Sequence, residues 1–369
     1  MCARKYIYDR ADWPELQYDA GKLQEALAGV YHARGKLFGA LNVLGFKVQE
    51  SLLLSSVSDE IITSSAIEGE KLDMTSVRSS VARRLGLEII GLTGKFPDHY
   101  TDGVVEMALD ASQNYLLPLT EERLFGWHAA LFPTGRSGAR RIVVGAFRTA
   151  EMEIVSGPFG KEKLHYRAPA PGRVPGEMKS FLEWIESGRD IDPFVKTGMA
   201  HLRFEAIHPF DDGNGRIGRA IADLLLARAD NSPQRFYSLS AQFLKEQKAY
   251  YDALESATKI SGNIDDWLLW FLNTLVHSMQ ASEQKIEAAM QKAAFFEKYR
   301  SIPMNERQLS MVNRLLDGFI GKLTTEKWGK MTKCSHDTAL RDINDLIKKD
   351  VLIKEDAGGR SASYTLKEY

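Results

Sequence analysis

Residues 208–219 read HPFDDGNGRIGR and bring one imidazole, two adjacent carboxylates, an amide, three glycines and two arginines together within twelve positions. The flanking segments, PFVKTGMAHLRFEAI and RIGRAIADLLLARA, have apolar residues at helical spacing, so the motif is predicted to be a tight loop between two helices. The first N–H groups of the second helix lack partners and carry the positive end of its dipole, which favours an anion. These residue types therefore point to chemistry on a phosphate.

The glycines and arginines of the motif suit that chemistry. Gly213 and Gly215 are expected to allow a positive φ and the close approach of a ligand to the backbone. Arg216 and Arg219, three positions apart, are expected to share a helix face and to bind further phosphate oxygens. Taken singly, glycines often only form a turn and arginines often only face water. Their combination within one short segment favours a binding site.

Two further residues of the motif could act on a bound phosphate. Asp212 supplies a hard oxygen ligand, and magnesium on a nucleotide is commonly held by one or two carboxylates plus the phosphates. His208 titrates near neutrality and can accept a proton from a hydroxyl, although a single histidine at a helix end is more often structural. An anion cradle, a metal ligand and a base together indicate a phosphoryl- or nucleotidyl-transfer site.

At every defined position the motif resembles the signature of the Fic family, HxFx[D/E]GNGRxxR. The resemblance extends over about residues 1–290 and implies a mainly α fold, an all-helical core with a β-hairpin flap. It also implies transfer of AMP from ATP to a Tyr, Ser or Thr hydroxyl of a protein, with pyrophosphate leaving. The expected cofactors are ATP and Mg²⁺, with Mn²⁺ as an alternative.

The resemblance implies a role for each residue of the motif. His208 would be the general base, Phe210 a buried anchor of the loop and Asp212 the ligand of the metal, whereas Asp211 falls at a variable position and has no assigned role. The phosphate contacts would come from the backbone N–H groups of Gly213 and Gly215, from Asn214 at the α-phosphate, from Arg216 at the β-phosphate and from Arg219 at the γ-phosphate.

A hairpin is predicted upstream of the motif, from about residue 151 to residue 166, from β-branched and aromatic residues around a Gly157-Pro158 turn. By the resemblance this flap would hold the target protein through main-chain pairing, a form of β-strand addition. The pairing strand would comprise Met152, Glu153, Ile154 and Val155. A hairpin that is merely exposed to solvent is the alternative.

An aromatic pair downstream, Tyr250 and Tyr251 in the segment KAYYDALE, could lie against the adenine of the nucleotide. Aromatic side chains at such positions also pack in protein cores, so both interpretations stay open here.

The segment TSSAIEGE, residues 63–70, places Ser64 and Glu68 four positions apart, on one face at the end of a helix predicted near 52–70. A carboxylate at a helix C-terminus opposes the helix dipole, which suggests a cationic partner such as an arginine of the anion site. The segment also resembles the family's inhibitory motif, [S/T]xxxE[G/N], through Ser64, Glu68 and Gly69. By that resemblance Glu68 would pair with Arg219 and occupy the space that the γ-phosphate needs; the alternative is an ordinary exposed helix end.

Helical periodicity runs through most of the chain, and the length of 369 residues favours two or three domains. The expected organisation is an N-terminal helical region over 1–110, a catalytic core over 111–290 and, after a linker at 299–306, a third region over 303–369. Helices are predicted at 22–43, 52–70, 104–115, 120–130, 176–187, 193–207, 216–229 and 265–296.

Residues 303–369 read as helix, turn, helix and a strand pair around Gly358-Gly359, an order typical of a winged helix-turn-helix. Ser335 is expected to cap the second helix, whose inward residues would be Leu340, Ile343, Leu346 and Ile347. Residues 322–369 contain 10 Lys/Arg and 8 Asp/Glu, a net charge of only +2, so the basic face typical of a DNA reader is weak. DNA, through Arg341, Lys348, Lys349 and Arg360, and a protein partner both remain candidates.

The composition excludes few classes of function. Net charge is −1, so bulk electrostatics gives no argument for a nucleic-acid or membrane partner. The only cysteines, Cys2 and Cys334, offer no disulfide framework and no zinc spacing. The most apolar window, residues 267–276, is far shorter than the ~20 residues that span a bilayer, and no signal peptide is evident. We expect a cytoplasmic protein.

Three functions follow from these observations. The first is an autoinhibited protein adenylyltransferase, acting on another protein or on itself. The second is a Fic-type enzyme that uses another nucleotide or phosphate donor, or that removes AMP. The third is a nucleotide-sensing regulator that binds DNA or protein, against which the intact His208 argues because sensing needs no base. A homodimer is an expectation from relatives only.

Overall fold

A computed structural model describes residues 5–87, 98–158, 160–161, 163–188, 190–355 and 362–367. Two compact units, Met1–Ser282 and Glu283–Tyr369, follow from the internal contacts, and we describe each by itself. Within the described residues strands occur only as three antiparallel pairs, β1–β2, β3–β4 and β5–β6, and helices form the rest of the regular structure. The predicted mainly α fold is therefore confirmed.

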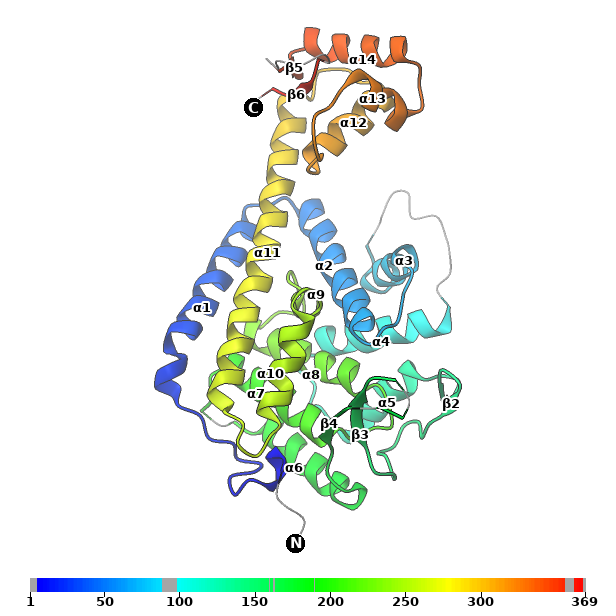
Figure 1. Cartoon of the computed structure of the whole chain (residues 1–369). Helices are drawn as coiled ribbons and strands as arrows, with labels where there is room; N and C mark the ends of the chain where they lie inside the picture. Colours follow the sequence, from blue (N-terminus) through cyan, green and yellow to red (C-terminus); the bar gives the residue numbers. More distant parts are fainter. Residues whose placement is uncertain are drawn as a thin grey trace. The chain divides into compact units, whose positions relative to one another are not determined.

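The first unit consists of helices with two small hairpins (Figure 1). Its helices are α1 (Ala20–Asn42), α2 (Phe46–Ile67), α3 (Met74–Leu85), α4 (His99–Gln113), α5 (Glu121–Leu131), α6 (Val174–Glu186), α7 (Pro193–Ile207), α8 (Asn214–Asp230), α9 (Leu239–Lys245), α10 (Gln247–Ala257) and the first part of α11 (Ile264–Lys298), and its strands are β1 (Arg136–Ser137), β2 (Arg140–Arg141), β3 (Glu153–Ser156) and β4 (Lys163–Arg167).

Helices α7 and α8 lie at the centre of this unit, and each makes its most extensive contact with the other. Most residues of both helices are buried, including polar ones on every side, as expected of helices enclosed by other elements. Asp192 caps α7 by accepting the N–H of Phe194, and Pro193 occupies the first helical position, where its missing N–H costs nothing. Residues 208–213 form the loop between these two helices, and the rest of the 208–219 motif forms the first turns of α8.

Helix α2 packs against α9 and α3 (Figure 1). Its buried Glu60 fixes it to the start of α9, because the carboxylate accepts the Ser238 hydroxyl at 2.8 Å, the Ser240 N–H at 3.0 Å and the Ser240 hydroxyl. The end of α2, which carries Ser64 and Glu68, is thereby held at a defined place on the core.

The eight predicted helices are confirmed, with ends displaced by a few residues except for 193–207, which matches α7. The largest displacement is at α2, which begins at Phe46 rather than near residue 52. Helices α3, α9 and α10, and α12 (Glu306–Leu316) of the second unit, were not predicted. Helix α3 nevertheless has a local signal, since Asp73 caps it by accepting the N–H of Ser76.

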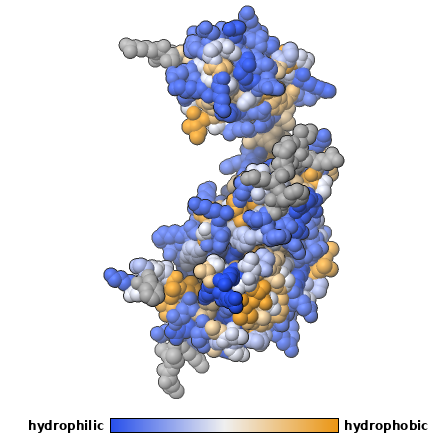
Figure 2. All heavy atoms as spheres, turned by 90° about the vertical axis from the view of Figure 1, so that its right-hand side faces the viewer, coloured by the Kyte–Doolittle hydropathy of each residue, from blue (hydrophilic) through white to orange (hydrophobic). Residues whose placement is uncertain are grey.

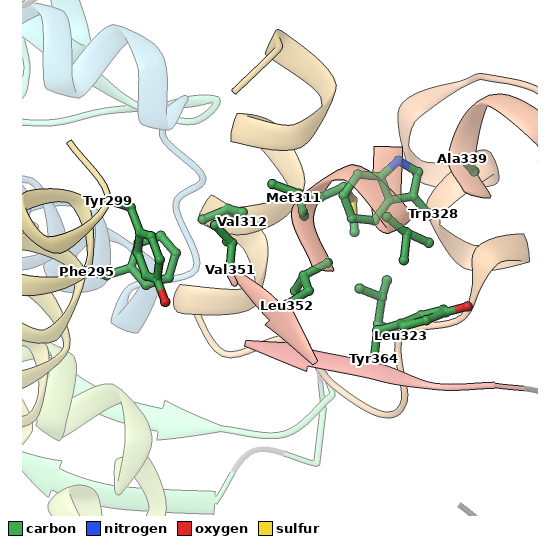
Figure 3. Packing of buried hydrophobic residues seen from close by; sticks show 12 residues of the cluster. Phe295, Tyr299, Met311, Val312, Leu323, Trp328, Ala339, Val351, Leu352 and Tyr364 are labelled. Carbon is green, nitrogen blue, oxygen red and sulfur yellow. The ribbon is translucent and has the colours of Figure 1, made fainter. Parts of the chain in front are cut away.

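The second unit contains the end of α11, α12 (Glu306–Leu316), α13 (Thr325–Thr332), α14 (His336–Lys348), β5 (Leu352–Lys354) and β6 (Tyr364–Leu366). Trp328 is fully buried at its centre. Figure 3 shows Phe295 and Tyr299 side by side at the end of α11, while Leu352 and Tyr364 come from the strand pair. The core of this unit therefore begins within α11, ahead of residue 303.

The predicted order of helix, turn, helix and strand pair occurs in this unit. Ser335 caps α14 by accepting the N–H of Thr338, as expected. Of the four predicted inward residues, Ile343 and Leu346 are buried, whereas Leu340 and Ile347 are half-buried. Gly358-Gly359 and Arg360 lie outside the described residues.

The face of the molecule in Figure 2 is mostly hydrophilic, with apolar residues scattered over it. Among the described helices none combines the length and the apolar character that crossing a membrane would require.

Candidate active site

The loop at the start of the 208–219 motif, residues 208–213, begins and ends with a left-handed residue. His208 ends α7 with a φ of 50°, and Gly213 precedes α8 with a φ of 81°, the conformation that glycine adopts most readily. Phe210 is fully buried, as predicted. The Asn214 side chain fixes it by accepting the Phe210 N–H and donating to the Phe210 carbonyl, each at 2.9 Å. Both polar atoms of the Asn214 amide thus bind Phe210 in this structure, and the contact of Asn214 with an α-phosphate remains a prediction.

Arg148 supports the loop from a segment 60 residues earlier. This buried side chain donates to the carbonyls of His208 at 2.8 Å and Pro169 at 2.6 Å, and its own N–H donates to the Pro209 carbonyl at 2.8 Å. Burial lowers the pKa of Arg148, yet a guanidinium stays protonated in proteins. No local sequence pattern marks this arginine, because its partners are backbone carbonyls distant in the chain.

His128, on α5, supports the loop from the other side. Its ring stacks on Phe210 with centroids 4.4 Å apart. The Gly145 N–H donates to Nδ1 at 3.1 Å, so Nε2 carries the proton and donates to the Asp212 carbonyl at 3.2 Å. Burial lowers the pKa of His128, which keeps the ring neutral. Sequence reasoning missed this residue as well.

The side chain of His208 is 16% exposed and lies beside Glu205, with 3.9 Å between His208 Nδ1 and Glu205 Oε2. Burial lowers the pKa of His208 to about 4, although a hydrogen bond with the Glu205 backbone opposes this change. The imidazole is therefore neutral at physiological pH. Because Nδ1 faces Glu205, Nε2 is the nitrogen that can accept a proton.

The two glycines of the motif differ from each other. Gly213 uses the positive φ that glycine permits, whereas Gly215 lies within the first turn of α8 and does not use it. Gly215 matters for another reason. A Cβ at this position would lie 2.1 Å from Glu68 Oε1, so the absence of a side chain makes room for the Glu68 carboxylate.

Arg216 and Arg219 both point from α8 into the site and are 4% and 3% exposed. Arg216 donates to the Tyr100 hydroxyl at 2.6 Å, stacks over the Phe132 ring at 5.1 Å, and its Nη2 lies 4.0 Å from Asp212 Oδ1. The two guanidinium groups and the N-terminus of α8 concentrate positive charge at one place, as an anion site requires.

Arg219 is bound to the end of α2. Its Nε donates to the Ser64 hydroxyl at 2.8 Å, and its Nη2 donates to the Ser64 carbonyl and to Glu68 Oε1, each at 2.8 Å. Burial opposes but the Glu68 carboxylate raises the pKa of Arg219, and the net change is upward. Gly69 ends the helix with a φ of 80°. The structure thus contains the Arg219–Glu68 contact that the resemblance to the inhibitory motif implied.

Asp212 has a side chain that is 40% exposed and accepts the Ser137 hydroxyl. No cluster of three or more His, Cys, Asp or Glu side chains that could hold a metal occurs in the described part of the chain. One carboxylate beside an anion site fits Mg²⁺, which protein carboxylates usually bind together with substrate phosphates. The adjacent Asp211 instead fastens the loop, because it accepts the Val143 N–H at 3.0 Å.

The two tyrosines of α10 have different surroundings. Tyr250 is 2% exposed, donates its hydroxyl to His201 Nε2 at 2.9 Å and stacks on Phe243 with centroids 4.4 Å apart. Its environment is that of aromatic core packing, the alternative left open above. Tyr251 is 45% exposed and donates to the Ile67 carbonyl at 3.3 Å, close to Glu68, so it is the better placed to contact a nucleotide base.

The predicted hairpin is present, with β3 and β4 paired in antiparallel register and a bulge after Ile154. The strand begins at Glu153, one residue later than predicted, although the Met152 carbonyl still accepts the Ala168 N–H at 3.0 Å. Val155 is 47% exposed. Within the described residues β3 pairs only with β4, which leaves its other edge for a further strand.

Known proteins resemble this chain in two regions. Residues 118–226 match the Fic/DOC family, and residues 6–87, which include α2 and Glu68, match a domain of unknown function, DUF4172. The second match covers the segment that supplies the contact with Arg219.

Two curated relatives share parts of the sequence. A probable protein adenylyltransferase of Aquifex aeolicus is 34% identical over 80 residues, 22% of this chain and 23% of that protein. Protein adenylyltransferase Fic of Aedes aegypti is 26% identical over 204 residues, 54% of this chain and 36% of that protein. The matches thus span well under half of the length of either relative.

The fold also has a solved counterpart. The crystal structure of a Fic family protein from Desulfovibrio desulfuricans G20 superposes with a TM-score of 0.55 at 18% identity, covering 96% of this chain and 98% of that one. The family match, the complete 208–219 signature and this shared fold agree with one another. Residues 118–226 of the chain are therefore similar to the Fic/DOC family, and the residues of the family signature begin in the loop between α7 and α8.

Proposed function

We propose that this chain is a protein adenylyltransferase that transfers AMP from ATP to a hydroxyl side chain and is inhibited by its own Glu68. The observation that carries the proposal is the contact of Arg219 with Glu68 inside a complete Fic signature. The names of the curated relatives support the reaction.

The loop and the start of α8 are proposed to bind the triphosphate. Arg216 would bind the β-phosphate and Arg219 the γ-phosphate, with the backbone N–H groups of Gly213 and Gly215 completing the cradle. Asp212 would hold Mg²⁺, or Mn²⁺ in its place, and the ion would supply charge neutralisation at the phosphates when bound. Tyr251 would contact the adenine.

His208 would act as the general base. Its neutral Nε2 takes the proton of the target hydroxyl while the hydroxyl oxygen forms a bond to the α-phosphorus. The bond from the α-phosphorus to the bridging oxygen of the β-phosphate breaks, and pyrophosphate leaves with its charge facing Arg216 and the N-terminus of α8. The loop needs no rearrangement to present this base, since Arg148 and His128 already fix it.

The target would be a protein segment with a Tyr, Ser or Thr residue, held along the free edge of β3 by main-chain hydrogen bonds. Because such pairing reads the backbone more than side chains, a surface segment of the same chain is a candidate target too.

The inhibition follows from competition for one guanidinium. Arg219 cannot bind the γ-phosphate and the Glu68 carboxylate in the same position, so the ATP pose suited to in-line attack requires Glu68 to leave. Since Glu60 fixes α2 to the start of α9, we propose that release involves the helix end around Glu68 rather than the whole helix.

Intact mass after incubation with ATP and Mg²⁺ tests the proposal. We expect a gain of one adenylate in Glu68→Gly, little gain in wild type, and none in Glu68→Gly with His208→Ala. Glu70→Gly is the matched control, because Glu70 is an exposed carboxylate two residues away that no contact joins to Arg219. Equal gain in Glu68→Gly and wild type would contradict the inhibition.

The same experiment separates the alternative functions. An added mass that appears only with another nucleotide would indicate another donor, and loss of AMP from a modified protein would indicate removal. If the chain binds a nucleotide but transfers nothing to itself or to proteins of a lysate, the result would favour the nucleotide-sensing regulator.

For the second unit we propose a binding role, with DNA as the partner to test. Arg341 and Lys348 are exposed on α14, which supports this role, whereas Lys349 is engaged by Asp345 at 2.6 Å and the Pro303 carbonyl at 2.8 Å. Salt-sensitive retention on a DNA column that Arg341→Ala weakens would support DNA; no retention at low salt would end this proposal.

A further inference from the structure

Glu205 is a buried carboxyl group that the proposed reaction does not yet use. It lies on the last turn of α7, three residues before His208, and its side chain is 12% exposed. Its Oε1 is buried and has no hydrogen-bond partner within the described residues. Burial disfavours the charged form of a carboxyl group, so an acid in such a place costs free energy and calls for an explanation.

The structure makes room for this carboxyl group between two helices. A Cβ on Gly218 of α8 would lie 2.6 Å from Glu205 Oε1, so the glycine leaves room for the acid in this position. The other oxygen, Oε2, lies 3.9 Å from His208 Nδ1, beyond hydrogen-bond distance, and this nitrogen is itself buried with no hydrogen-bond partner within the described residues. Glu205 therefore sits on the side of the imidazole opposite to the nitrogen that would meet the target hydroxyl.

The charged and titratable groups around Glu205 come from every neighbouring element. They are His208 in the loop, Arg219 on α8, Glu68 at the end of α2 and Tyr250 on α10. Burial raises the pKa of Glu205 to about 7; Arg219 lowers it and Glu68 raises it. The acid thus changes its charge within the physiological range, beside a histidine that is itself neutral there.

We propose that Glu205 is the positioning residue of His208: it holds the imidazole from the Nδ1 side and, as a carboxylate, balances the positive charge that the ring acquires. This inference rests on the proposed function of His208 as a base. The proton of the target hydroxyl moves to Nε2, the Nδ1 proton stays on the ring on the side that faces Glu205, and no other group gains or loses a proton.

Only the ionised form of Glu205 can balance the positive charge of the His208 ring, and this fixes the direction in which turnover changes with pH. A protonated Glu205 would leave the imidazolium as a buried charge without a counter-ion, so turnover is expected to rise with pH through about 7 as Glu205 ionises. With glutamine at this position that rise is expected to disappear, and His208 to titrate only at its own lowered pKa.

The decisive test is a titration that needs no activity. Ring signals of selectively labelled histidine are followed by NMR in wild type and in Glu205→Gln, with His208→Gln to assign the peak and Glu183→Gln, an exposed glutamate on α6, as control. We expect the His208 signal to inflect near pH 7 in wild type and in the control but not in Glu205→Gln. An unchanged His208 titration curve in Glu205→Gln would overturn the proposal, whether or not the chain transfers AMP.

A kinetic test in the Glu68→Gly background adds a second readout. We expect Glu205→Gln to lower kcat by ~10²-fold, with KM for ATP within about twofold, and to abolish the rise near pH 7. Glu205→Asp is expected to keep that rise with a smaller loss of kcat. A loss of kcat in Glu205→Gln with the pH profile unchanged in shape would show a structural role only and would overturn the proposal.

Discussion

The Glu68 carboxylate occupies the space above Gly215: a Cβ on Gly215 would lie 2.1 Å from Glu68 Oε1 and 3.1 Å from Arg219 Nη1. The inhibitory contact therefore depends on three residues, the acid, its arginine and a glycine that leaves room for them. Gly215 belongs to the Fic signature and Glu68 to the DUF4172 region, so the contact joins the two matched regions of the chain.

Gly215→Ala is expected to lower the free energy of unfolding by about 1 kcal/mol, because the added methyl group displaces Glu68 from Arg219. Gly35→Ala, in the interior of α1 with open space around it, should instead stabilise by about 0.5–1 kcal/mol, as alanine does in helices. Thermal unfolding of both variants, and of Gly215→Ala combined with Glu68→Ala, checks this. If the cost of Gly215→Ala is the same with and without Glu68, the two residues do not compete for space.

Asp212→Asn is expected to reduce transfer in the Glu68→Gly background by ~10²-fold or more, because the amide is a poor ligand for Mg²⁺. ATP binding through Arg216 and Arg219 should persist. The neighbouring Asp211→Asn is the matched control and should change transfer by only a few-fold, since Asp211 only fastens the loop through the Val143 N–H. Rates measured over a range of Mg²⁺ and Mn²⁺ concentrations give the answer; similar losses in both variants would speak against a specific metal ligand.

The buried His201 is expected to make the protein less stable in acid. Burial lowers the pKa of His201 to about 3, so only the unfolded chain takes up the proton as the pH falls below about 6.5. Its contribution to stability is thus complete above pH ~6.5 and is lost progressively towards the folded-state value. In His201→Gln this contribution is absent, so the stability difference between wild type and variant should shrink by ~1.4 kcal/mol per pH unit below pH ~6.5.

Calorimetric unfolding of both proteins at pH 7, 6 and 5 checks that prediction. A difference that stays constant over this range would mean that His201 is protonated in the folded protein, against its burial and against the donation of Tyr250 to its Nε2.

His165 is expected to hold the flap to α10. Its ring lies between the Ser156 hydroxyl at 2.5 Å from Nε2 and the Glu255 carboxylate at 2.6 Å from Nδ1. His165→Ala should accelerate tryptic cleavage at the lysines and arginine of the hairpin several-fold, because cleavage requires local opening. Ser156→Ala, which removes only the weaker of the two partners, should have a smaller effect, and equal cleavage of all three proteins would contradict this role.

Many local features of this protein could be predicted from the spacing of residues within single helices and loops. The 208–219 segment alone indicated a loop between two helices and a glycine at position 213 that permits the positive φ found there, because these features depend on neighbours only a few positions away. The burial of Phe210 was implied by the resemblance to the Fic signature. The i, i+4 spacing of Ser64 and Glu68 likewise placed both on one face of α2. The match of 193–207 to α7 has the same origin, since a cap and a helical period are local properties.

Only the tertiary structure decided which distant side chains meet. Arg148 and His128 reach the loop from 60 and 84 positions away in the chain, and neither belongs to a pattern that a single element could reveal. The same holds for Tyr250, which the packing of α10 placed in the core rather than at the site. The importance of Gly215 was not visible either, because it lies in the space that this glycine leaves for Glu68 at the end of another helix. Local periodicity tells which face of an element is apolar; which groups share a pocket depends on how the elements pack, and that arises from long-range burial and charge pairing.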